Sequence, residues 1–145
     1  MLLELVALFC TGLFAGAAIY ISLVEHPARL ECGSALAIAE FGPSYRRAAV
    51  MQASLAAVGC LAGVVAWARG SPTPVLVSGL LLGAVIPFTL IAIRPTNERL
   101  LGVDLDRSSP EAGALLARWG RLHAVRSALS GVALLLLGLH LTGIL

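Results

Sequence analysis

The sequence predicts an all-α fold, an integral membrane four-transmembrane-helix bundle arranged as two parallel helical hairpins. Of the 145 residues, 59% are hydrophobic and only 12% are charged, whereas a soluble domain carries about 25% charged residues. The mean hydropathy is correspondingly high, at +0.93. The charges are clustered, so they leave four uncharged runs, each close to the ~20 residues that span a bilayer as a helix. These runs cover residues 5–24, 48–68, 70–93 and 127–145.

The length allows one domain over residues 1–145. Its spans are expected at about 3–24, 48–68, 75–93 and 124–143. Every span contains a small-xxx-small step, which lets helix backbones approach closely in lipid. The sequence leaves open whether these steps also join copies of the chain into a homo-oligomer. The steps are Gly12 and Gly16, Gly59 and Gly63, Gly79 and Gly83, and Ser127 and Gly131.

The arginines predict the orientation in the membrane. All ten basic residues are arginine, and nine of them lie within residues 25–47 and 94–126. With four spans these segments share one side, which the positive-inside rule places in the cytoplasm. We therefore expect a protein of the cytoplasmic (inner) membrane, with loops 25–47 and 94–123 cytoplasmic and both termini outside. Because the arginines adjoin membrane spans, we expect membrane lipids as partners and no nucleic acid.

The local sequence also predicts where helices begin and end. Pro27 and Pro95 follow the glycine steps of the first and third spans at similar distances, and both are predicted to end their helices. This weak repeat favours the two parallel hairpins. A short amphipathic helix over residues 34–41 is predicted to stop at Gly42-Pro43. The capping box at 108–111 predicts a helix that begins near residue 109 and continues into the fourth span.

Ionisable residues close to a membrane interior are costly and mark candidate sites. Trp119, His123, Arg126 and Ser130 recur at i, i+4, i+7 and i+11, so they form one stripe on a continuous helix. His123 or His26 is a candidate general base, and Arg94 or Arg126 can stabilise the anion that forms. Trp119 can stack on a flat ligand, and Tyr45 opens the second span at the same end.

A metal centre is the alternative for the same end of the bundle. His26, His123, Glu25 and Glu98 can converge there, and imidazole with carboxylate suits a transition metal, Cu, Fe or Zn. The same groups can also work without a metal. A purely structural interpretation stays open as well, because arginine and histidine at a helix end bind lipid phosphates and Glu25 can form a structural ion pair.

Several segments together resemble a known family. They are Gly12-Leu-Phe-Ala-Gly16, Ser22 to Leu30, Tyr45 to Gln52, Pro95-Thr-Asn-Glu-Arg-Leu100 and Trp119-Gly-Arg-Leu-His-Ala-Val-Arg126. These segments resemble the anthrone-oxygenase-like family of small four-helix membrane proteins. Fungal members oxidise an anthrone to an anthraquinone, which requires removal of a proton and addition of oxygen at an activated ring carbon. The resemblance implies Asn97, His123 and Arg126 as the site, with Trp119 beside them.

We therefore expect a membrane-embedded oxygenase or oxidase that acts on a hydrophobic, aromatic or quinone-like substrate at the cytoplasmic end. His123, Asn97 and Arg126 are its predicted catalytic residues, and Trp119, Arg94 and Tyr45 are expected to bind the substrate. The alternative is a non-catalytic metal- or lipid-binding accessory membrane protein. A small transporter is less favoured, because only Gln52 and His140 are strongly polar well inside the spans.

Overall fold

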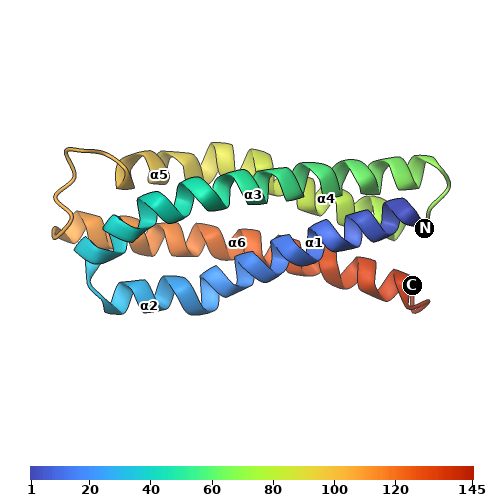
Figure 1. Cartoon of the computed structure of the whole chain (residues 1–145), viewed down its shortest axis with the longest axis horizontal. Helices are drawn as coiled ribbons and strands as arrows, with labels where there is room; N and C mark the ends of the chain where they lie inside the picture. The colour runs from blue at the N-terminus through green and yellow to red at the C-terminus, as the bar shows by residue number, and fades with distance from the viewer.

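The computed structural model describes all 145 residues and consists of four long helical rods (Figure 1). Each rod is long and apolar enough to cross a membrane, which confirms the predicted all-α, four-helix membrane class. The first rod is α1 (Leu2–Tyr20), η1 (Ile21–Glu25) and α2 (His26–Glu31), and the second is α3 (Ser34–Ala68). The third is α4 (Thr73–Phe88), η2 (Thr89–Ile93) and α5 (Arg94–Leu100), and the fourth is α6 (Pro110–Leu141).

Both termini and the turn at 69–72 lie at one end of the bundle, here called the terminal end (Figure 1). The turn at 32–33 and the loop at 101–109 lie at the other, the loop end. Helices α1 and α4 each pack against both α3 and α6. The two hairpins therefore point in the same direction, as the sequence predicted. The assignment of the loop end to the cytoplasm stays a prediction.

The rods are longer than the bilayer requires. Helix α3 has 35 residues, which at ~1.5 Å per residue is about 50 Å, against about 30 Å of hydrocarbon. Large apolar side chains face outward along the rods, including Leu23 and Ile91 at 73% and 78% exposed. Lipid would cover these side chains, because water would not solvate such a surface favourably.

Pro27 and Pro95 do not end their helices, contrary to the prediction. Each rod instead forms one π-helical turn before its proline, in which the His26 and Arg94 amides bond to carbonyl oxygens five residues earlier. The chain then continues as α2 and α5. A proline ring clashes with the carbonyl oxygen four residues before it, and a wider turn re-routes the backbone around that clash.

The other helix boundaries were predicted with mixed success. The predicted stop at Gly42-Pro43 is wrong, because α3 continues through Pro43 without a break. Phe41 is buried in the loop-end core beside this proline, and that packing offsets the lost backbone bond. The predicted start of the fourth helix is confirmed, since Ser109 caps α6 by accepting a hydrogen bond from the Ala112 amide at 3.2 Å.

The glycine steps of the second and third spans join α3 to α4. A Cβ added to Gly63 would lie 3.0 Å from the Gly79 Cα, and one added to Gly79 would lie 3.2 Å from the Cys60 carbonyl oxygen. These two backbones therefore touch, as expected for small residues in lipid. By contrast, Gly16 of the first span has open space around it, and a Cβ added to Gly12 would lie 3.8 Å from the Leu134 side chain. This step therefore makes no close backbone contact within the chain.

Candidate functional site

A cavity of about 190 Å³ lies between the four rods towards the loop end. Thirteen of its 21 lining residues are hydrophobic. It is larger than the roughly 150 Å³ engineered cavity that binds benzene in another protein. Every rod contributes a polar side chain to its wall, and these include Glu25, Gln52, Asn97, His123 and Arg126. An apolar chamber with a few polar groups is the usual form of a small-molecule site.

His123 is held by a chain of hydrogen bonds that fixes its tautomer. The Ala18 carbonyl oxygen can only accept, so the Ser127 hydroxyl donates to it, at 2.8 Å. Ser127 Oγ then accepts from the Ser22 hydroxyl at 2.8 Å. Ser22 has no further proton, so its oxygen accepts from His123 Nδ1 at 3.0 Å. The proton therefore belongs on Nδ1, and Nε2 is left as an acceptor with no partner in the protein.

Trp119 lies on the loop-end side of His123 and packs against the imidazoles of both His123 and His26. The His123 imidazole stacks on its indole with ring centroids 4.7 Å apart. The His26 imidazole lies against the same indole at 5.0 Å. The site thus holds an imidazole–indole–imidazole cluster, buried from solvent. His26 also contacts the backbone of α6 closely, because a Cβ on Gly120 would lie 2.6 Å from its Nε2.

Arg126 lies on α6 three residues beyond His123 and contacts two neighbouring helices. Its Nη2 donates to Gln52 Oε1 at 2.6 Å, and its guanidinium carbon lies 5.3 Å from the centre of the Phe14 ring. Two nitrogens of this pair, Arg126 Nε and Gln52 Nε2, are buried without a hydrogen-bond partner. Unsatisfied buried donors are rare in proteins, so the pair can still bind an acceptor.

Two further residues of the predicted site also line the cavity. Asn97, on α5, is 3% exposed, and its Oδ1 has no hydrogen-bond partner. Tyr45, on α3, stacks on Phe41 with ring centroids 5.7 Å apart. The structure thus brings together six of the predicted residues around the cavity, which are Glu25, Tyr45, Asn97, Trp119, His123 and Arg126.

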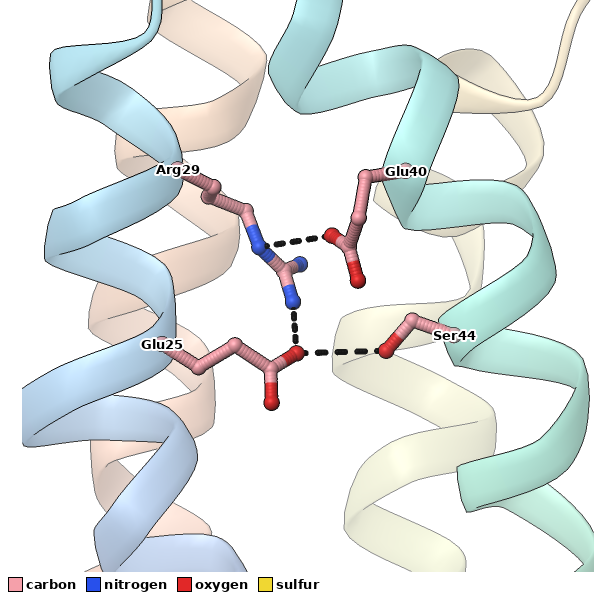
Figure 2. A network of polar contacts seen from close by, with 4 residues as sticks. All are labelled: Glu25, Arg29, Glu40 and Ser44. Carbon is pink, nitrogen blue, oxygen red and sulfur yellow. Dashed lines mark hydrogen bonds and ion pairs between the residues drawn. The ribbon is translucent and has the colours of Figure 1, made fainter.

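A polar cluster closes the loop end of the cavity between α2 and α3 (Figure 2). Arg29, whose side chain is 6% exposed, pairs with Glu25 and with Glu40, the latter at 2.9 Å. The Ser44 hydroxyl donates to the same Glu25 oxygen at 3.2 Å. The Glu25 carboxylate is therefore already engaged, and Figure 2 shows it turned towards Arg29 and Ser44.

Arg94 and Glu98 lie outside the site. Their side chains are 62% and 61% exposed and form an ion pair at 2.7 Å on the outer face of α5. Neither residue lines the cavity, so the structure gives no support to Arg94 as a substrate-binding residue or to Glu98 as a ligand. No three or more His, Cys, Asp or Glu side chains are grouped so that they could hold a metal ion. The predicted donor set is not assembled, and we assign no metal to this site.

A second, outer hollow lies on the surface seam between the first rod and α3. Tyr20 and Met51 flank it towards the terminal end and are 55% and 49% exposed. It shares part of its lining with the inner cavity. These shared residues are Ile21, Glu25, Ser44, Ala48 and Gln52. The two hollows therefore adjoin along the seam between the first rod and α3.

Three residues of this site were not assigned a role from the sequence. Ser127 lies one turn beyond His123 and could have been found by that spacing. Ser22 lies in the first rod, and no local spacing indicates that its partner is His123 on α6. Arg29 is one turn beyond Glu25, which is the usual spacing of a helical ion pair, but nothing in the sequence indicates that it is buried.

The fold and the site define a class, a small membrane bundle that encloses an apolar chamber beside an oriented histidine. The chain belongs to the anthrone oxygenase family, which it matches over residues 41–136. It is 30% identical over 129 residues to the anthrone oxygenase tpcL of Aspergillus fumigatus, covering 82% of this chain and 78% of that protein. No solved structure matches the chain. The family resemblance expected from the sequence motifs is thereby confirmed, and the family is one of oxidoreductases.

Proposed function

We propose that this protein oxidises an anthrone-type aromatic substrate inside the membrane, with His123 as the general base. The observation that carries the proposal is the fixed histidine tautomer, which leaves Nε2 free to accept a proton in an apolar cavity. Membership of the anthrone oxygenase family supports the substrate class. The buried Arg126 guanidinium, one turn away on the same helix, supports the formation of an anion.

The reaction can be written with His123 and dioxygen alone. His123 Nε2 removes a proton from the ring carbon opposite the ketone, and the electron pair delocalises onto the ketone oxygen, where Arg126 stabilises it. Dioxygen then accepts electrons from that carbon and forms a carbon–oxygen bond to it. His123 returns its proton to the peroxide oxygen, and loss of water leaves the second carbonyl group. Anthrone and O₂ thus become anthraquinone and water.

The remaining residues hold the substrate. The Tyr45 phenol offers a flat face for an aromatic ring system, and the Asn97 amide offers a hydrogen bond to a polar substituent. Trp119 already packs against the two imidazoles and contributes apolar wall to the cavity. We infer that the substrate enters from the bilayer through the outer hollow between the first rod and α3. The two exposed apolar side chains beside this hollow, Tyr20 and Met51, support a lipid-side entrance.

The test is turnover of an anthrone by the detergent-purified protein, measured as quinone absorbance above the uncatalysed rate. With ¹⁸O₂, one labelled atom is expected in each quinone. His123→Gln should lower the rate by about 10²-fold or more, the usual contribution of a general base. The control is His140→Gln, because His140 lies in the last turn of α6 at the terminal end. Equal loss from both variants, or no quinone from the wild type, would favour the non-catalytic accessory protein.

Metal removal tests the alternative centre predicted from the sequence. Because the geometry offers no group of three ligands, we expect turnover to survive exhaustive treatment with a chelator. Elemental analysis of the same sample would check that no transition metal is left. Loss of turnover that Fe, Cu or Zn restores would instead support a metal at His26 and His123.

A further inference from the structure

The inner cavity contains hydrogen-bonding groups that no residue of the protein satisfies. Gln52 and Asn97 are 2% and 3% exposed, so neither side chain is solvated by bulk water. Gln52 Nε2, Arg126 Nε and Asn97 Oδ1 are all buried without a partner, and all three residues line the cavity. Leaving a buried polar group unpaired is costly. Neighbouring protein atoms cover these three atoms, so a ligand reaches them after a small adjustment of the side chains, and each atom indicates what that ligand must supply.

The Gln52 amide has only one possible orientation. Its oxygen accepts from Arg126 Nη2 at 2.6 Å, and a guanidinium has no acceptor. A flipped amide would direct an N–H group at an N–H group and lose this bond. The Gln52 NH₂ group is therefore fixed as a donor. Asn97 has no hydrogen bond that sets its orientation, so it can present either end of its amide and is less selective.

The geometry points to a carbonyl-binding subsite, in which Gln52 Nε2 and Arg126 Nε together receive the ketone oxygen of a polycyclic aromatic ligand. This inference rests on the proposed function for its substrate class and adds the direction in which the substrate lies. Arg126 is three residues beyond His123 on α6, or about 4.5 Å deeper along the helix axis. The ketone oxygen lies deep, at Gln52, and the reacting carbon opposite it lies nearer the loop end, at His123.

The subsite is tested by binding rather than turnover. Anthracene and 9,10-anthraquinone share a three-ring outline, but only the quinone has carbonyl oxygens. Dissociation constants are measured by quenching of Trp119 fluorescence in a Trp67→Phe background. The wild type is expected to bind the quinone roughly tenfold or more tightly than anthracene, since paired buried donors contribute on the order of 1–2 kcal/mol. Detergent partitioning differs between the two ligands but is the same for every variant, so it cancels when the ratio of the two constants is compared between variants in one detergent.

Two substitutions of Gln52 and one matched control make the test specific. Gln52→Glu keeps an acceptor for Arg126 but removes the NH₂ group, whereas Gln52→Met removes both. Each is expected to reduce the preference for the quinone by about tenfold. Thr89→Val is the control, because Thr89 also lines the cavity but its hydroxyl already donates to the Val85 carbonyl oxygen at 2.6 Å. The control should keep the wild-type preference.

The outcomes separate this inference from the proposed function. A quinone preference that both Gln52 variants lose supports the subsite, even if no anthrone is oxidised. A wild type without the preference, or a stably folded Gln52→Glu variant that retains it, overturns the subsite even if turnover is observed. Thermal unfolding in detergent shows which variants are folded. Gln52→Glu is expected to stay folded because it preserves the hydrogen bond to Arg126.

Discussion

Replacing Ser22 with alanine tests whether the orientation of His123 matters for turnover. Ser22 is the only partner of His123 Nδ1 and also donates to Ser127, so Ser22→Ala breaks two hydrogen bonds. It leaves the Nδ1 proton unsatisfied in a residue that is 2% exposed. An unsatisfied buried donor costs about 1–3 kcal/mol, and the imidazole can relieve that cost by moving its proton to Nε2. In that tautomer the base is lost.

We therefore expect Ser22→Ala to lower kcat by about 10- to 100-fold, part of the 10²–10⁴-fold usual for a positioned base. KM should change little, because Ser22 does not line the cavity. The assay is quinone formation at saturating oxygen, with kcat and KM determined separately. Ser22→Thr should restore most of the rate, since it retains the hydroxyl group. That rescue would distinguish positioning from a general loss of packing.

The matched control is Ser78→Ala. Ser78 is also buried and joins two helices, by donating to the Ala133 carbonyl oxygen at 2.7 Å, but it lies outside the cavity. Both variants should lose stability, about 1 kcal/mol for each hydrogen bond broken, while only Ser22→Ala loses turnover. The reasoning is refuted if both variants lose the same activity, or if Ser22→Ala keeps the wild-type kcat.

Three other substitutions test the packing and the entrance. Gly79→Leu should lower the unfolding temperature in detergent, because the new Cβ would lie 3.2 Å from the Cys60 carbonyl oxygen of α3. Gly16→Leu is the control and should leave that temperature unchanged, since Gly16 has open space around it. Equal effects of the two variants would contradict the described packing of α3 against α4. Ala17 lines the outer hollow but not the inner cavity, so Ala17→Trp should block the proposed entrance and lower kcat/KM. Ala84→Trp is the control: Ala84 is exposed and lines neither hollow, so kcat/KM should stay unchanged. Gly120→Ala should displace the His26 imidazole, which lies against Gly120. It should lower the free energy of unfolding, measured by chemical denaturation, by about 1–3 kcal/mol. An unchanged free energy of unfolding would show that the His26 imidazole moves freely.

Much of the fold could be predicted from charge placement alone. A charged group inside hydrocarbon is so costly that the uncharged runs located the four rods without any tertiary information. The breaks within the rods could not be found in this way. Pro27 and Pro95 each disfavour the helix locally, and a local rule therefore predicts a stop. Whether the chain stops or widens into a π-turn depends on packing by the other three rods.

The same π-turns explain why some of the predicted residues line the cavity and others do not. One additional residue in a turn rotates everything after it by about 100° around the helix axis. Beyond the π-turn at 89–93, Asn97 is buried while Arg94 and Glu98 face outward. A prediction that assumes regular α-helical spacing through residues 89–93 therefore assigns the residues after that turn to the wrong faces of the helix. The stripe of Trp119, His123 and Arg126 was predictable because α6 has no such turn.

The two ends of the bundle are built differently, and this explains where the cavity lies. At the terminal end, Gly63 and Gly79 bring the α3 and α4 backbones into contact, and buried alanines with Val75 and Leu137 fill the remaining space. Towards the loop end, the π-turns η1 and η2 stand in the first and third rods, and residues from both line the cavity. A π-turn takes in one residue more than an α-helical turn and widens the backbone there, and such turns are frequent at functional sites. Repetition of the π-turn thus opens the chamber at the level of His123, and the glycine contact keeps the rest of the bundle closed.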